Sequence, residues 1–191
     1  SFVSLDKADH LLSREGDARY VADIVAAWAG RLLETDLGVD AVHNAVLVSE
    51  TGLGKFHNTV TAGRHQLLAD EPVMVGGLDS GPTPYDFLSA ALGACTGMTL
   101  RMYANRKKLA LGRVSVEVRH GKVAADHCED CGEAVEGPGG RIDRFERIIS
   151  VEGELDDALR GKLVEIAGKC PVHRTLEHAS AVVTRVDEKI S

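Results

Sequence analysis

The 191-residue sequence contains no uninterrupted apolar run close to the roughly 18 residues that a membrane-spanning helix requires. Its first residues lack the basic and apolar stretch of a signal peptide, although the chain begins at Ser1 rather than Met and a natural leader could have preceded it. Basic residues are outnumbered, with 22 Lys and Arg against 29 Asp and Glu. The resulting net charge of -7 disfavours nucleic acid and anionic membranes as partners. We therefore expect a soluble cytoplasmic protein.

Cysteine is scarce, with four residues in the whole chain: Cys95, Cys128, Cys131 and Cys170. Structural disulfides are rare in the cytosol, so these residues are expected to be buried thiols, metal ligands or redox-active groups. The 44% of hydrophobic residues is sufficient to build the core of one medium-sized domain.

Residues 1–38 differ in pattern from the rest. Asp17 could cap a helix whose apolar residues recur with a period near 3.6. From residue 39 the pattern predicts two groups of strands separated by helices, which is an α+β arrangement. The expected strands are 42–49, 56–62, 65–69, 114–118, 141–153 and 181–186; the expected helices are 85–108, 156–169 and a short one after Pro171; the expected loops are 70–84 and 121–140.

Two of the cysteines lie in distinctive surroundings. Cys95 has small neighbours, which allow a backbone or a ligand to approach its sulfur. Cys170 precedes Pro171 and is expected at the start of a helix, where unpaired N–H groups, with possible positive charge from His173 and Arg174, would lower the thiol pKa. The alternative is that both are ordinary buried thiols.

Residues 76–108, GGLDSGPTPYDFLSAALGACTGMTLRMYANRKK, and 169–176, KCPVHRTL, resemble the two cysteine motifs of the OsmC/Ohr family. The resemblance implies antiparallel sheets packed around two central helices in an intertwined homodimer. It also implies that Cys95 attacks a peroxide to form a sulfenic acid, that Cys170 closes a disulfide with it, and that an external dithiol reduces this bond. No cofactor is required.

The family also places an arginine beside the thiolate, and Arg64, in the run 62–65, matches it by resemblance. A guanidinium could hold the thiolate and a peroxide oxygen together, whereas the alternative is a solvated turn arginine. In hydroperoxide-specialised members a glutamate follows the proline near the helix start. Here Tyr85 occupies that position after Pro84, and Asp86 stands one place further on, about 100° around a helix.

The segment His127-Cys128-Glu-Asp-Cys131 could bind zinc, because two intervening residues let both sulfurs face one ion. His127 is the third candidate ligand, and Asp126, His120 or a partner chain could supply a fourth. A redox dithiol and a pair of unliganded thiols are the alternatives.

Residues 1–33 resemble the C-terminal end of an α/β-hydrolase, with His10 in the place of the triad histidine. No Gly-X-Ser-X-Gly motif accompanies it, so His10 is expected to be inert. We therefore expect a hydrolase remnant at 1–38 joined to an OsmC-like domain at 39–191.

Two functions follow from these motifs. One is a peroxidase for hydrogen peroxide or a small hydrophobic peroxide, and the other is a non-catalytic module that binds a ligand or zinc and serves a fused hydrolase. Some apolar residues of the predicted helix 85–108 could line either the core or an acyl-binding pocket, and helical spacing favours the core: Leu88, Leu92, Met98 and Met102.

Overall fold

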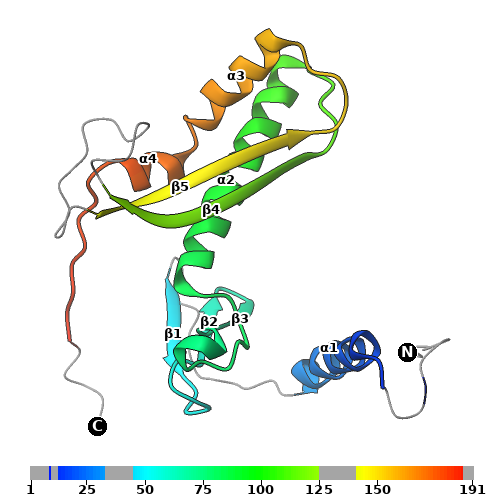
Figure 1. The fold of residues 1–191 in the computed structure, drawn as a ribbon, viewed down its shortest axis with the longest axis vertical. Coiled ribbons are helices and arrows are strands. Elements are labelled where there is room, and N and C mark those ends of the chain that lie inside the picture. The colour runs from blue at the N-terminus through cyan, green and yellow to red at the C-terminus, as the bar shows by residue number, and fades with distance from the viewer. Residues whose placement is uncertain (1–8, 10–12, 33–44, 125–140, 187–191) are drawn as a thin grey trace. The chain divides into compact units, whose positions relative to one another are not determined.

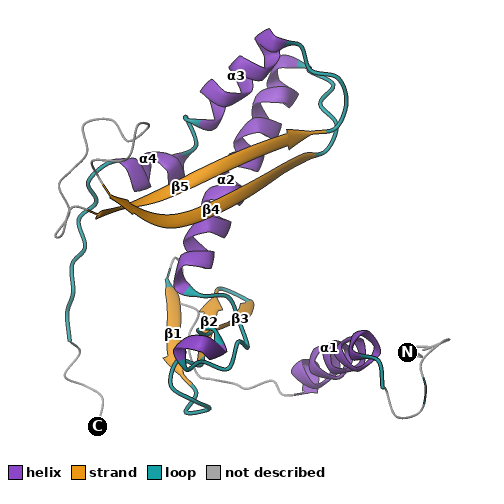
Figure 2. Ribbon diagram, viewed as in Figure 1, coloured by secondary structure: helices purple, strands orange, loops and turns teal. Residues whose placement is uncertain are grey.

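The structure, a computed structural model of the chain, describes residues 9, 13–32, 45–124 and 141–186 (Figure 1). The chain divides into two compact units, the first comprising residues 1–46 and 62–64 and the second the remainder. Helices and strands occur in groups rather than in strict alternation, so the predicted α+β class is confirmed (Figure 2). Among the described helices, none combines the length and the apolarity needed to cross a membrane.

Helix α1 (Glu15–Leu32) corresponds to the predicted N-terminal helix. It begins two residues before Asp17, so the prediction that Asp17 caps it is wrong. The N–H of Asp17 donates to the carbonyl of Arg14 at 3.0 Å, and the Asp17 side chain lies in the first turn, where the positive helix end favours a carboxylate. His10 falls outside the described residues, and the hydrolase resemblance remains a prediction.

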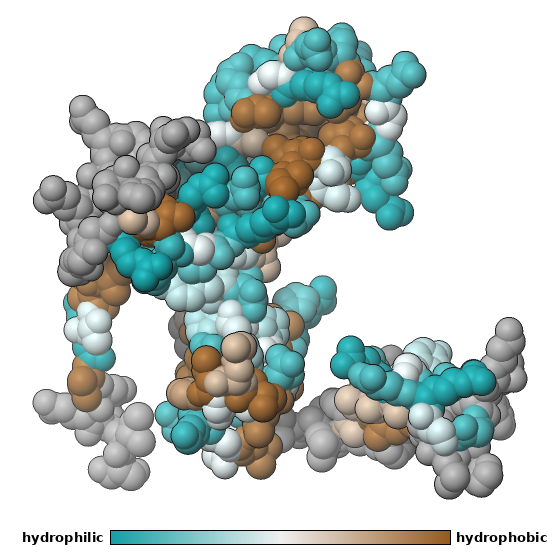
Figure 3. Space-filling view, in the orientation of Figure 1, coloured by the Kyte–Doolittle hydropathy of each residue, from teal (hydrophilic) through white to brown (hydrophobic). Residues whose placement is uncertain are grey.

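Three short strands form one sheet in the order β1 (Val46–Glu50), β2 (Asn58–Ala62) and β3 (His65–Ala69). The turn between β2 and β3 uses Gly63, whose φ of 58° lies in the left-handed region. Within these strands Val60 is the buried apolar residue, while β1 is exposed along its whole length. Hydrophobic residues consequently lie at the surface over this sheet (Figure 3).

The segment before the central helix is organised around Asp70, which is 2% exposed. Its carboxylate accepts the N–H groups of Glu71 and Leu78 at 2.8 and 3.0 Å and the hydroxyl of Ser80 at 2.8 Å. Burial opposes ionisation of Asp70, but these hydrogen bonds outweigh it and lower its pKa. The predicted loop therefore contains ordered structure, including the 3₁₀ turn η1 (Val73–Val75).

Helix α2 (Pro84–Lys107) agrees closely with the predicted helix. Thr83 is its N-cap and forms a capping box with Asp86, whose side chain accepts the Thr83 N–H at 2.9 Å. The helix ends at Lys108, which adopts the left-handed conformation with φ 55°. One stripe of the helix is buried: Leu92, Thr96, Leu100 and Ala104.

This stripe differs from the predicted one. Leu92 is buried as expected, but Leu88, Met98 and Met102 are 42%, 67% and 72% exposed. Their prediction as core residues is therefore wrong for this chain. Helical spacing identifies an apolar face, but the buried face is the one that other elements cover.

Strands β4 (Val114–Ala124) and β5 (Arg141–Val151) pair antiparallel, and α2 packs against β4 (Figure 1). The strand predicted at 114–118 thus continues for six more residues, the last four of which, 121–124, lie in the expected loop. Gly93 permits the close approach of α2 to the hairpin, because a Cβ placed there would lie 3.3 Å from Cγ2 of Val118 and 3.6 Å from the carbonyl oxygen of Val116.

Helices α3 (Asp157–Ala167) and α4 (Pro171–Glu177) follow the hairpin, and both pack against α2. Asp156 caps α3 by accepting the N–H of Leu159 at 2.7 Å. The main core joins α2 to α3, with Leu100, Leu163, Ile166 and Ala167 at its centre.

Residues 181–186 are extended and exposed, with Val182 and Val186 each 89% exposed. Their prediction as a strand is wrong, because none of the described strands pairs with them. Alternating valines indicate a tendency to form a strand, but a strand also needs a neighbouring backbone to complete its hydrogen bonds.

Candidate functional site

Cys95 lies in the middle of α2 and Cys170 lies between α3 and α4, yet their side chains meet. Both thiols are free rather than joined as a disulfide, and they lie close enough for each to shift the pKa of the other. Cys170 is 0% exposed, whereas Cys95 is half-buried. The structure thus holds a reduced thiol pair with one enclosed residue and one partly exposed residue.

The surroundings of the two sulfurs separate their acidities. Burial raises the pKa of Cys95, and the hydrogen bond with Cys170 raises it further. Burial acts in the same direction on Cys170. There, however, hydrogen bonding from Cys95, from the N–H of His173 and from the Thr96 hydroxyl prevails, so the pKa of Cys170 is lowered.

The sequence around Cys170 explains its position. Cys170 is the N-cap residue of α4 with extended dihedral angles, φ -60° and ψ 130°, and Pro171 occupies the first helical position. Its N–H donates to the carbonyl of Ala167 at 3.2 Å. The chain therefore turns directly from α3 into α4 and leaves the thiol against α2.

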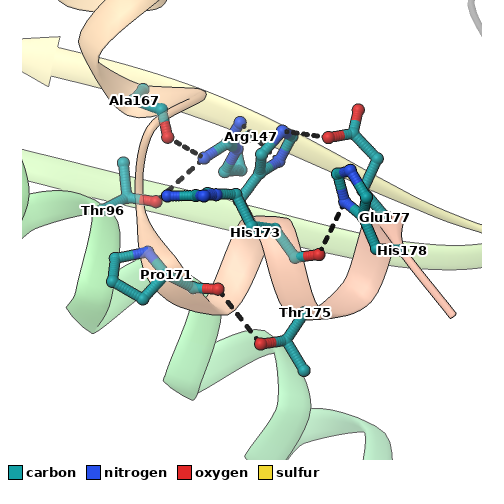
Figure 4. Close-up of polar contacts among 9 residues, drawn as sticks. Thr96, Arg147, Ala167, Pro171, His173, Thr175, Glu177 and His178 are labelled. Atoms are coloured by element: carbon teal, nitrogen blue, oxygen red, sulfur yellow. Dashed lines mark hydrogen bonds and ion pairs between the residues drawn. The ribbon is translucent and has the colours of Figure 1, made fainter. Parts of the chain in front are cut away.

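Arg147 on β5 is the site residue that the sequence analysis missed. Its Nη1 donates to Oγ1 of Thr96 at 3.0 Å and to the carbonyl oxygen of Ala167 at 2.9 Å, and its Nη2 donates to Nδ1 of His173 at 3.2 Å (Figure 4). A signal was available, because position 147 shares one face of the strand with Phe145 and Ile149. A charged residue on the inward face of a strand indicates a specific partner.

His173 continues this network to Glu177, with 3.2 Å between Nε2 and Oε2. Arginine can only donate hydrogen bonds, so Nδ1 of His173 must accept from Arg147 and Nε2 must carry the proton. The two contacts together fix the orientation of the His173 ring.

Of the other predicted site residues, Arg64 lies exposed in the turn between β2 and β3. Its pairing with a thiolate remains a prediction. The Asp86 carboxylate is engaged in the cap of α2, where it accepts both the N–H and the hydroxyl of Thr83, at 2.9 and 2.7 Å. These contacts give Asp86 a structural role in capping α2.

Tyr85 stacks on His120, with ring centroids 4.1 Å apart and planes inclined by 7°. His120 also bonds through Nε2 to Oδ1 of Asp143 at 2.8 Å, and this contact, with the nearby Lys122, lowers the pKa of the Asp143 carboxyl. The position at which the resemblance places a glutamate is therefore occupied by an aromatic ring that packs on an imidazole.

A cavity of about 300 Å³ adjoins the Arg147 network. Arg147 and His173 form part of its wall, together with the carboxylates of Asp143 and Glu177. Arg144 and three apolar side chains complete a mixed surface: Leu92, Phe145 and Leu176.

The predicted zinc ligands Cys128, Cys131 and His127 lie outside the described residues, as does Asp126. Within the described part of the chain, no group of three or more His, Cys, Asp or Glu residues could hold a metal ion.

A family model described as OsmC-like protein matches residues 77–185, which include both Cys95 and Cys170. No curated protein matches the sequence.

Two solved structures illustrate which proteins this chain resembles in fold. A Psychrobacter arcticus protein assigned to osmotic stress and detoxification has 18% identity and a TM-score of 0.54, over 68% of this chain and 85% of its own. An organic hydroperoxide resistance protein of Elizabethkingia anophelis, crystallised with thiocyanate bound, has 18% identity and a TM-score of 0.51, over 68% of this chain and 84% of its own.

Proposed function

Because the chain belongs to the family of OsmC-like proteins, we propose that it is a thiol-dependent peroxidase that reduces organic hydroperoxides or hydrogen peroxide. The observation that carries this proposal is the contact between Cys95 and Cys170, which lie 75 positions apart in the sequence. The name of the E. anophelis structure, an organic hydroperoxide resistance protein, supports the choice of substrate class.

In the proposed cycle Cys95 is the nucleophile, because it retains exposure while Cys170 is enclosed. Attack on the terminal peroxide oxygen breaks the O–O bond and converts Cys95 into a sulfenic acid, with release of an alcohol or water. Cys170 then condenses with the sulfenic acid to a disulfide, and an external dithiol reduces that disulfide by exchange. The cycle requires no metal or cofactor.

We also propose a cytoplasmic homodimer. Apolar residues are exposed on β1, on β3 and on α2, among them Val46 at 62%, Leu67 at 49% and Met102 at 72%. Burying such surfaces against a second copy is favourable, and a small hydrophobic peroxide could enter between them. Light scattering tests this state: a particle of twice the 20.4 kDa chain mass is expected, and a monomer would contradict it.

The second candidate is a binding module without peroxide turnover, fused to a hydrolase of which residues 1–38 would be the end. The Tyr85 ring stacked on His120 favours this alternative, because it replaces the carboxylate implied by the resemblance. A zinc ion at Cys128, Cys131 and His127 would be its ligand. Metal analysis of the native protein and Cys128→Ser tests the ion: equal zinc contents would exclude this loop as the site.

Peroxide consumption with a dithiol reductant separates the two functions. Cys95→Ser should abolish turnover, because the nucleophile is lost. Cys170→Ser should stop after one peroxide per chain and leave a Cys95 sulfenic acid that mass spectrometry detects after chemical trapping. Equal turnover in the native protein and Cys95→Ser would exclude the proposed chemistry, and absence of turnover in both would favour the binding module.

A further inference from the structure

Arg147 on β5 connects the segments of chain that carry the two cysteines (Figure 4). Its Nη1 donates to Oγ1 of Thr96, the residue after Cys95 on α2, and to the carbonyl oxygen of Ala167 at the end of α3. Its Nη2 donates to Nδ1 of His173 on α4. One side chain therefore contacts three helices, and the cycle proposed above gives it no task.

The connector between α3 and α4, residues 168–170, is a tight turn that ends at Cys170. The N–H groups of Lys169 and Cys170 donate to carbonyl oxygens three residues earlier, at 3.0 and 3.2 Å. Such bonds tighten the end of a helix, but their geometry is poorer than that of α-helical bonds. The carbonyl that accepts the Cys170 N–H is that of Ala167, and its second lone pair accepts Arg147 at 2.9 Å. Arg147 therefore supports the turn that carries Cys170.

Both acceptors of Nη1 are enclosed. Thr96 and Ala167 are 0% and 2% exposed, so water has little access to either oxygen. Without the guanidinium, each oxygen would lose a partner that water does not readily replace. The separation of the α3–α4 turn from α2 would then depend mainly on apolar packing, which is not directional.

We propose that Arg147 is a positioning residue that holds Cys170 within reach of Cys95, so that the disulfide closes before a second peroxide oxidises Cys95 further. The inference rests on the proposed peroxidase function and deepens its second step. It concerns the backbone that carries the thiols and requires no contact between Arg147 and either sulfur.

Two reactions compete for the Cys95 sulfenic acid. In the first, the Cys170 sulfur bonds to the Cys95 sulfur, the S–O bond breaks, and the hydroxyl group leaves with the Cys170 proton as water. In the second, a further ROOH transfers its terminal oxygen to Cys95–SOH, which gives the sulfinic acid Cys95–SO₂H and ROH. The first reaction requires Cα atoms roughly 4.4–6.8 Å apart, whereas the second requires only peroxide. Displacement of the turn therefore slows disulfide closure alone.

Equilibration with a glutathione buffer measures this positioning in the full-length chain without peroxide. One GSSG oxidises the two thiols to the Cys95–Cys170 disulfide and yields two GSH, so the equilibrium constant is the effective concentration of one thiol at the other. Differential alkylation and peptide mass spectrometry distinguish this pair from Cys128 and Cys131. Arg147→Gln should lower the effective concentration about tenfold, because a charge-assisted hydrogen bond that orders the turn is lost.

Arg101→Gln is the matched control. Arg101 also donates from its guanidinium to two backbone carbonyl oxygens, those of Leu111 and Gly112 at 2.9 and 2.5 Å, but these residues follow α2 and do not join α3 to α4. Its replacement should leave the effective concentration unchanged, even where it lowers the urea midpoint of the reduced chain. A general loss of stability is thereby separated from loss of positioning.

A second pair of variants keeps Arg147 in place. Thr96→Val removes one acceptor at nearly constant side-chain shape and should produce a smaller fall in the effective concentration, and Thr96→Ser should restore the native value. If Arg147→Gln does not fold, this pair decides the question alone.

The competing reaction supplies a second readout. During turnover with excess peroxide and a dithiol, Arg147→Gln should accumulate Cys95 sulfinic acid faster than the native protein, detected as two added oxygen atoms on the Cys95 peptide. Arg101→Gln should accumulate it at the native rate.

An effective concentration that is unchanged in both Arg147→Gln and Thr96→Val would overturn the inference, as would equal sulfinic acid in Arg147→Gln and the native protein. With native turnover, either result refutes the role of Arg147 and leaves the peroxidase standing. Native turnover without a Cys95–Cys170 disulfide refutes the closing step and the inference with it. A native chain that forms the disulfide but consumes no peroxide refutes the peroxidase, while the glutathione equilibrium still decides whether Arg147 positions Cys170.

Discussion

The core between α2 and α3 allows a quantitative test on two adjacent residues. Leu163 is 3% exposed and packs with Leu100 and Ile166, whereas Val164 next to it is 68% exposed. Leu163→Ala removes buried carbon atoms and leaves a cavity, which should lower the free energy of unfolding by about 3 kcal/mol. With a urea m-value of about 2 kcal/mol/M, the unfolding midpoint should fall by about 1.5 M.

Val164→Ala is the control, because it shortens a side chain on the same helix without opening the core. Its effect on the free energy of unfolding should stay within about 0.5 kcal/mol, or about 0.25 M in midpoint. Urea unfolding of both reduced variants, followed by circular dichroism, gives the comparison. Equal midpoints for the two variants would refute the placement of Leu163 in the core.

Three further predictions concern single contacts. Thr83→Ala should lower the free energy of unfolding by about 1 kcal/mol through loss of the α2 cap, while Thr83→Ser should not; equal urea midpoints would contradict this role. A hydrogen bond from Lys162, reinforced by a second lysine, lowers the pKa of Glu165 from 4.5 to about 2, so this contact stabilises the fold above pH 4.5 and is lost as the pH falls toward 2. Glu165→Gln should therefore flatten the fall in urea midpoint over that range, and an unchanged slope would argue against the contact. Tyr85→Ala should cost about 1 kcal/mol by removing the stack on His120, and Tyr85→Phe should retain it; thermal unfolding with equal Tm for both variants would oppose this.

Local signals made α2 predictable. Thr83 and Asp86 have the spacing of a capping box, and the residue between them that begins the helix, Pro84, suits its first position. The buried face was not predictable in the same way, because Thr96 is enclosed while Met98 and Met102 are exposed. Which face is covered depends on β4, α3 and α4, and a period of 3.6 residues carries no information about those neighbours.

In the thiol site, too, the features set by local sequence were predictable and the contacts between distant segments were not. The surroundings of Cys95 and Cys170 drew attention to both residues from the sequence. The alternation of β5 could have marked Arg147 as an inward-facing charge, but its partners Thr96 and Ala167 lie 51 and 20 positions away and could not be predicted from that alternation. The resemblance directed attention to Arg64, whose role stays a prediction, while the structure places the guanidinium of Arg147 beside Thr96.

Gly93 has a consequence for redox behaviour even though it has no functional group. It lies two residues before Cys95, where α2 packs on the Val118 side chain, and even a methyl group there would meet Cγ2 of Val118 at 3.3 Å. A larger side chain would lift the helix from the strand and carry one sulfur away from the other. The distance between the Cys95 and Cys170 sulfurs therefore depends partly on Gly93. A larger residue there would prevent the S–S bond although both cysteines would still be present.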